Sequence, residues 1–519
     1  MLRRDPRQIA LAMLLVWAAT APAAAQDALP PAIAAITGKP AYASSTWGLA
    51  VLDAASGAEL LSHAADKMFV PGSVMKIYSS GTALEVYGPD HRFETAVYRR
   101  GAVEAGVLRG ELVLVASGDF SLGLRDRPDG TLAFNSAPEL DHNYADTGLP
   151  GAALVPGSRP LAGLEELAAQ VRAAGIREAR DVIIDDRLFT TYRGWPDGVI
   201  APIWVNENVI DIVTTPTAPG AAATVDWRPR TAAYRMVSEV RTVAGDGAPL
   251  TVDSPRAGVI RVRGQIGASS RPVVNIWPVE DPASFARTAF VEALGRAGVT
   301  VKARATGANP AGRLPAASAY PASERVARRA SPPLSQYTKV ILKTSYNRGA
   351  DLMLCLVAVR AGQRDCVAGL TRAVALMAKS GVSPLSTIVF DGAGSDERER
   401  TSPADLARYL RAIGTTPWGA ALRRDLAVLG VDGDLAKSQV GASVAGKVQA
   451  KTGARVAMAP DERQGIATAL AMAGYAVTAS GREVVFAIML RDLAFKGLAE
   501  LFAAREDQAA IAAAIQTSY

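Results

Sequence analysis

The chain has 519 residues and a formal net charge of +6, and 20% of its residues are charged. This length predicts more than one domain. The modest charge, without a lysine and arginine block interleaved with aromatics, argues against a nucleic-acid partner. Two cysteines and three histidines, with no H-E-x-x-H motif, argue against a zinc site.

The N-terminus has the pattern of a secretory signal. Three arginines precede an apolar run over residues 9–19, and an A-x-A cleavage pattern ends at Ala25. We therefore expect residues 1–25 to be a signal peptide and the protein to be periplasmic. The alternative is a retained membrane anchor, although the run is short for a span. No later segment has the apolar length of a transmembrane helix.

The first globular elements are two strands and a helix. Strands are predicted over Trp47–Asp53 and into Leu60–Leu61. A Pro-Gly loop then precedes Ser73, and a helix should run from there to about Val86, since Gly88-Pro89 stops it. Ser73 is therefore expected at or near the start of a helix.

Ser73-Val74-Met75-Lys76 is an S-x-x-K sequence. Residues three apart share a helix face, so the Ser73 hydroxyl and the Lys76 amine should lie side by side. Serine is a poor nucleophile until a base removes its proton, and lysine acts as that base only when its pKa is lowered. Lys451 could supply the nearby positive charge. The motif alone is weak, because an ordinary exposed serine and lysine have the same spacing.

The stretch between Ser73 and Ser345 is too long to be an unstructured loop in a compact enzyme. We expect it to fold as one or more inserted domains, mostly β with some helix. Residues 123–160 are rich in turn formers and predict a long surface excursion. The clearest elements are strands at 112–115, 182–184 and 273–276, a helix at 164–174, and a proline-rich return linker at 313–333.

Ser345-Tyr346-Asn347 is an S-x-N sequence at the start of a predicted helix that continues through Leu354. Ser345 would relay a proton to the leaving nitrogen, and Asn347 would bind a substrate amide. In isolation the same residues are equally consistent with a helix cap and a turn.

Lys451-Thr452-Gly453 lies on a predicted strand at 448–454. A cation and a hydroxyl at a strand edge suit a substrate carboxylate, and the glycine lets substrate approach the backbone. Strands at 470–478 and 484–490 and a helix at 493–515 should follow. That helix is expected to pack on the sheet, although an amphipathic membrane anchor is the alternative.

Cys355 and Cys366 are expected to form a disulfide, because they lie 11 positions apart in an exported protein. The alternative is a pair of buried free thiols.

The three motifs, in this order, resemble the D-alanyl-D-alanine carboxypeptidase/endopeptidase family of low-mass class C penicillin-binding proteins, peptidase family S13. Further similar blocks are Phe69–Ser73, Gly118–Leu122, Asp391–Gly394 and Ala473–Tyr475. The resemblance extends from about residue 40 to residue 515.

This resemblance implies an α/β (α+β) fold. A transpeptidase domain like that of serine β-lactamases and penicillin-binding proteins would be split by a large insertion of mainly β domains. The catalytic domain would comprise 27–90 and 325–519. Inserted domain II would comprise 91–115 and 200–324, with domain III nested at 116–199.

The resemblance also implies a serine DD-peptidase that acts through an acyl-enzyme on peptidoglycan stem peptides and cross-links, and that binds β-lactams covalently. It further implies that no metal or organic cofactor is needed. The implied catalytic residues are Ser73, Lys76, Ser345, Asn347 and Lys451. A β-lactamase or esterase is an alternative, disfavoured by the lack of an E-x-x-L-N motif and by the insertion. A non-hydrolytic penicillin-binding protein with a weakened site is another.

The chain departs from the family pattern at the rim of the site. Ala454 replaces the usual hydroxyl after K-T-G, although its backbone N–H can still serve an oxyanion hole. We expect Arg455 to take over part of the carboxylate binding, with Thr452 and Gly453. Ala393 replaces a usual serine, and extra residues around 457–465 should lengthen a loop.

Overall fold

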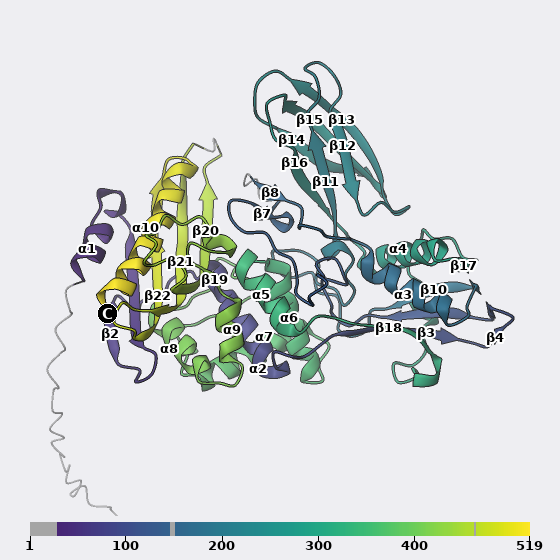
Figure 1. Ribbon diagram of the computed structural model, residues 1–519, viewed down its shortest axis with the longest axis horizontal. Coiled ribbons are helices and arrows are strands. Elements are labelled where there is room, and N and C mark those ends of the chain that lie inside the picture. The colour runs from purple at the N-terminus through teal and green to yellow at the C-terminus, as the bar shows by residue number, and fades with distance from the viewer. Residues whose placement is uncertain (1–28, 146–150, 461–462) are drawn as a thin grey trace, which may run out of the picture.

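The computed structural model describes residues 29–145, 151–460 and 463–519. The predicted signal peptide lies outside the described residues. Figure 1 shows a sheet flanked by helices, formed by both ends of the chain, and a second lobe formed by its middle.

The first lobe is built on a seven-stranded antiparallel sheet with the order β19-β20-β21-β22-β1-β2, and β23 pairs with β21. The two N-terminal strands therefore join five C-terminal ones, because β1 pairs with β22. The strands are β1 (Thr46–Asp53), β2 (Glu59–His63), β19 (Ala427–Val428), β20 (Val448–Met458), β21 (Gly465–Val477), β22 (Glu483–Arg491) and β23 (Leu493–Phe495).

Helices cover both faces of this sheet, so its central strands are apolar on both sides. Side chains alternate along β22: Val485 and Ala487 join the core below one helical layer, and Phe486 and Ile488 join the other. One layer holds α1 (Pro31–Thr37) and α10 (Leu498–Ser518). The opposite layer holds α2 (Met75–Tyr87), α5 (Leu334–Thr344), α6 (Asn347–Arg360), α7 (Cys366–Lys379), α8 (Pro403–Gly414) and α9 (Gly419–Asp425).

The chain leaves and re-enters the first lobe through neighbouring antiparallel strands. β3 starts beside the end of β18, where Glu94 pairs with Ala330. These strands belong to a four-stranded sheet with the order β10-β6-β3-β18, against which α3 and α4 pack. Its elements are β3 (Glu94–Arg100), β6 (Glu111–Val115), β10 (Asp181–Asp185), β18 (Arg325–Ala330), α3 (Ala162–Ala173) and α4 (Pro282–Arg296).

Two three-stranded sheets project from the second lobe in Figure 1. They are formed by β11 (Val209–Thr215), β12 (Thr224–Arg228) and β16 (Val273–Pro278), and by β13 (Arg235–Val243), β14 (Leu250–Arg256) and β15 (Val259–Gly267). The shorter strands are β4 (Val103–Glu104), β5 (Val107–Leu108), β7 (Leu140–Asp141), β8 (Ala152–Ala153), β9 (Glu178–Ala179) and β17 (Thr300–Val301).

The strand pairing inside the insertion bears on its domain boundaries. β10 lies within the segment predicted as domain III (116–199), yet it pairs in parallel with β6 of domain II. The two projecting sheets instead use the continuous segment 209–278. We therefore propose that the nested unit is 209–278 and that the remainder of 91–330 forms one domain around β3, β6, β10 and β18.

Two local predictions were wrong. The stretch 123–160 is no surface excursion, because Arg125, Asp141 and His142 are buried within it. The helix predicted from Leu493 starts at Leu498, since 493–495 pair with β21 instead. Of the residues predicted to lengthen a rim loop, 457–458 and 465 extend the strands of the β20–β21 hairpin, in which Met458 pairs with Gly465.

Candidate active site

Ser73 lies in a short 3-10 helix, η2 (Gly72–Val74), that leads directly into α2. The predicted helix is thereby confirmed, and it ends at Gly88 as expected. Lys76 stands one turn after Ser73, fully buried, and its Nζ lies 2.8 Å from Ser73 Oγ. The same Nζ donates to the Ala393 carbonyl at 2.7 Å. Amine and hydroxyl are therefore held in position for proton transfer.

The surroundings of Lys76 lower its pKa to about 7. Burial is the largest cause and the positive charge of Lys451 is the second, while carboxylates including those of Asp197 and Asp391 act in the opposite direction. A large fraction of Lys76 is therefore neutral near pH 7 and able to accept the Ser73 proton.

The loop after residue 390 fixes the carbonyl that holds Lys76. The Asp391 carboxylate accepts hydrogen bonds from the backbone N–H groups of Ala393 and Gly394, at 2.8 and 2.7 Å. The contact from residue 393 to Lys76 is made by the backbone, so Ala393 supplies it as well as serine would. Asp391 was not among the expected functional residues, although it belongs to a block quoted for the family resemblance.

The second motif lies between two helices. Ser345 terminates α5 in the left-handed conformation, with φ 62° and ψ 35°, and Asn347 begins α6. A non-glycine residue in this region carries a strain of about 1–2 kcal/mol. Both Ser345 and Asn347 are half-buried.

Asp197 is a site residue that the sequence did not reveal. It comes from the inserted region, and its carboxylate accepts a hydrogen bond from the Asn347 side-chain amide at 2.6 Å. The neighbouring Trp195 indole donates to the Phe390 carbonyl at 2.8 Å, which fastens this loop to the first lobe. The only local signal was a turn-rich sequence.

The third motif lies on β20, directly beside Ser73. A Cβ on Gly453 would lie 2.6 Å from the Pro71 carbonyl oxygen and 3.0 Å from the Ser73 backbone nitrogen. Glycine is thus required for this close approach. The exposed Ala454 follows at the strand edge.

Lys451 and Thr452 are buried around a shared acid, Asp434. Its carboxylate accepts from the Thr452 hydroxyl and lies 3.4 Å from Lys451 Nζ. Arg505, on α10, donates to the Thr452 hydroxyl at 3.3 Å. The pKa of Lys451 is lowered, mainly by burial, which Asp434 opposes and Arg505 assists. Asp434 and Arg505 were not predicted from the sequence.

A cavity of about 330 Å³ adjoins this group. The residues around it include Leu140, Asp434, Thr452, Met472, Phe502 and Arg505. It therefore lies between the inserted region, β20 and α10.

Arg455 points to a different part of the site. Its guanidinium donates to the Ser395 carbonyl and lies 3.6 Å from the exposed Glu397. These contacts suit Arg455 to hold the loop that carries Asp391. They do not test its predicted role in carboxylate binding, for which Arg505 is the competing candidate.

Cys355 and Cys366 are joined by a disulfide that links α6 to the start of α7. The sulfur pair is buried. It lies on the helix that begins with Asn347.

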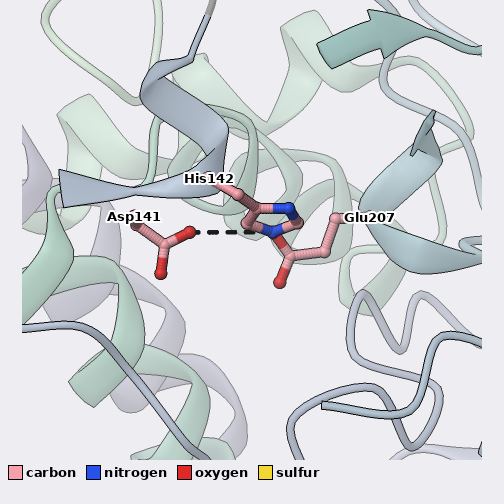
Figure 2. A group of neighbouring side chains, drawn as sticks. All are labelled: Asp141, His142 and Glu207. Carbon is pink, nitrogen blue, oxygen red and sulfur yellow. Dashed lines mark hydrogen bonds and ion pairs between the residues drawn. The ribbon is translucent and has the colours of Figure 1, made fainter. Parts of the chain in front are cut away.

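A buried cluster behind the second motif contains the one metal-ligand grouping found in the described ranges: Asp141, His142 and Glu207. Figure 2 shows the His142 ring between the two carboxylates. Arg125 forms ion pairs with both carboxylates, and His142 Nδ1 lies 2.6 Å from Asp211. An ion would have to displace Arg125, so this donor set fits a network of ion pairs better than a metal site.

Comparisons with known proteins identify similar sequences and similar folds. The sequence profile of the D-Ala-D-Ala carboxypeptidase 3 (S13) family matches residues 29–516. A D-alanyl-D-alanine carboxypeptidase from Actinomadura sp. (strain R39) is 29% identical over 316 residues, covering 56% of this chain and 58% of the relative.

Two similar solved structures are both of penicillin binding protein 4 from Haemophilus influenzae. One has a TM-score of 0.65 at 18% identity and covers 90% of this chain and 94% of that one. The other, a complex with a β-lactam, has a TM-score of 0.65 at 17% identity and covers 93% and 99%. These likenesses confirm the predicted fold class.

Across residues 29–145, 151–460 and 463–519, no helix is both long and apolar enough to cross a membrane.

Proposed function

The chain belongs to the D-Ala-D-Ala carboxypeptidase 3 (S13) family, and on that premise we propose that it is a serine DD-peptidase that acts through an acyl-enzyme on Ser73. The observation that carries the proposal is the contact between Ser73 Oγ and the buried amine of Lys76, whose pKa is about 7. Such an amine is the base that a serine nucleophile needs.

Acylation starts with transfer of the Ser73 hydroxyl proton to Lys76 Nζ. The Ser73 oxygen then attacks the carbonyl carbon of the penultimate D-Ala. The backbone N–H groups of Ser73 and Ala454 stabilise the resulting oxyanion. The close approach of β20 to the Ser73 segment supports this role.

The leaving nitrogen must gain a proton as its bond to the carbonyl carbon breaks. Ser345 relays this proton. Ser345 is only half-buried, which supports its contact with a bound substrate. Asn347 orients the substrate amide. Water then attacks the acyl carbonyl, which releases the shortened peptide and regenerates the Ser73 hydroxyl.

The substrate carboxylate binds near Thr452 with Lys451 and Arg505. Within the described ranges, the charged groups around Thr452 are the cations Lys451 and Arg505 and the anion Asp434. These described groups include one more cation than anion, which suits binding of a substrate carboxylate. Arg505 would replace the hydroxyl that Ala454 lacks.

The substrates are proposed to be D-Ala-D-Ala stem peptides of peptidoglycan and D-Ala-meso-diaminopimelate cross-links. β-Lactams would acylate the same serine. The protein is further proposed to be exported to the periplasm after cleavage near Ala25. N-terminal sequencing of the exported protein should give a chain that starts at Gln26.

Mass spectrometry after incubation with benzylpenicillin tests the nucleophile. One adduct is expected on the peptide that contains Ser73, and none in Ser73→Ala. An adduct elsewhere, or none on the folded wild-type protein, would contradict the proposal. D-Ala release from a pentapeptide and cleavage of a cross-linked dimer then measure the two peptidase activities, while rapid release of penicilloate would indicate a β-lactamase.

A further inference from the structure

The inserted region contacts four consecutive residues, the three of the second motif and Arg348 after them. The Tyr144 hydroxyl donates to the Ser345 carbonyl at 2.6 Å. Asn347 donates to the Asp197 carboxylate at 2.6 Å. The Arg125 guanidinium is 6.0 Å from the centre of the Tyr346 ring. Arg348, the next residue after the motif, donates to the Asn143 side-chain oxygen at 3.1 Å.

The inserted side chains that make these contacts are themselves tightly fixed. The Asn143 amide donates to Glu207 at 2.5 Å and to Asp141 at 2.9 Å. Arg125 donates to both Asp141 oxygens at 2.9 Å. Tyr144 belongs to the same short helix, η3 (His142–Tyr144), which follows directly after Asp141. The contacts to the second motif are thus anchored in a buried set of ion pairs.

The Tyr144 hydroxyl contacts the backbone at a strained residue, Ser345. Its left-handed conformation is unfavourable for a serine, and it sets the direction in which the Ser345 side chain leaves the backbone. The Tyr144 hydroxyl binds the carbonyl of this same residue. A hydrogen bond at that position favours the strained conformation over relaxed alternatives.

We propose that the insertion positions the proton relay of the active site, and that Tyr144 is a positioning residue for Ser345. This inference rests on the proposed acyl-enzyme function. Tyr144 acts on the relay through its hydrogen bond to the Ser345 carbonyl. Loss of the Tyr144 hydroxyl should therefore slow only the step in which the leaving group receives its proton.

The test compares two substrates that differ in their leaving group. The D-Ala-D-Ala amide needs a proton on its nitrogen, whereas the corresponding thioester expels a thiolate that needs none. In Tyr144→Phe, kcat for the amide should fall about 3- to 10-fold, the effect expected from loss of one hydrogen bond. The rate for the thioester should stay within about twofold of wild type.

Tyr320→Phe is the matched control, because its hydroxyl donates to a carboxylate, that of Asp185, in the same inserted region and not to the Ser345 carbonyl. Both substrates should be processed at wild-type rates by this variant. An equal loss on both substrates in Tyr144→Phe, or no loss on either, overturns the proposal. Should Tyr144→Phe fail to fold, Asn143→Ala in the same assay tests whether the insertion positions the second motif, since it removes the contact between Asn143 and Arg348.

Failure of the proposed function would be recognised separately. A wild-type protein that is not acylated on Ser73 by benzylpenicillin contradicts the acyl-enzyme itself. A wild type that is acylated, with a Tyr144→Phe variant that shows no substrate-selective loss, contradicts only the role of the insertion.

Discussion

Arg505 on the C-terminal helix donates a hydrogen bond to the Thr452 hydroxyl on β20, 3.3 Å away. The helix therefore does more than cover the sheet, because it brings a guanidinium to the third motif. The family resemblance led us to expect Arg455 to take over the task of the missing hydroxyl at Ala454. The structure directs Arg455 to the Ser395 carbonyl and leaves Arg505 beside Thr452.

Arg505→Ala should raise KM for D-Ala-D-Ala peptides by at least about tenfold, consistent with loss of a charge-assisted contact of about 1.5–3 kcal/mol. The effect should be smaller for a peptide with an amidated C-terminus, which lacks the carboxylate. Arg455→Ala is the matched control and should change KM by less than about threefold. A larger increase in KM for Arg455→Ala than for Arg505→Ala would show that Arg455 binds the substrate carboxylate.

Several elements of the site follow from local sequence. The S-x-x-K spacing predicted that Ser73 and Lys76 would meet on one helix face, because three residues make almost one helical turn. The two structures of penicillin binding protein 4 confirm the fold class. Apolar runs likewise predicted the central strands, since these are buried on both faces.

Contacts between distant segments could not be predicted in this way. Asp197 contacts the second motif from an inserted loop, and Arg505 contacts the third motif from the last helix. Neither residue lies in a local sequence pattern that predicts a role in the site. The stretch around Arg125 and Asp141 was mistaken for surface because it is polar and turn-rich. These charges are buried because they neutralise one another, a property of the pair that the sequence of either segment does not contain.

Gly453→Ala should nearly abolish acylation. The added Cβ would lie 2.6 Å from the Pro71 carbonyl oxygen and 3.0 Å from the Ser73 nitrogen, so β20 and the Ser73 segment must move apart. Stopped-flow acylation by a chromogenic β-lactam should show a loss of at least about tenfold, by the general cost of misplacing reacting groups. Gly441→Ala is the control, because its nearest neighbour would be 3.8 Å away. Wild-type acylation by Gly453→Ala would disprove the close approach.

The disulfide between Cys355 and Cys366 should stabilise the helix pair α6 and α7. Thiol titration of the denatured, unreduced protein should detect no free thiol. The double variant Cys355→Ala/Cys366→Ala should lose about 2–3 kcal/mol of unfolding free energy, the amount expected for a short closed loop. Two free thiols per chain would contradict the pairing.

The rate of acylation should rise with pH through about 7, because only neutral Lys76 accepts the Ser73 proton. Burial and the charge of Lys451 lower the pKa of Lys76 to about 7, so the protonated form dominates below that value. Measurement of the acylation rate with benzylpenicillin between pH 5 and 9 should give this rising limb. Lys76→Arg keeps the charge but cannot act as a base, and it should be inactive throughout. A rate that does not vary across this range would exclude Lys76 as the base.

Stability should fall as pH rises from about 6.5 to about 10, and His142 is the cause. Burial alone would lower the pKa of His142, but the carboxylates of Asp211, Glu207 and Asp141 raise it to about 10. A raised pKa in the folded protein means that its contribution is complete below the unfolded value of about 6.5 and is lost as pH passes through the folded value. Urea unfolding of wild type and His142→Asn at pH 6, 8 and 10 measures the difference. The gap in unfolding free energy should be largest at pH 6 and smallest at pH 10, and a constant gap would show that His142 is neutral in the folded protein.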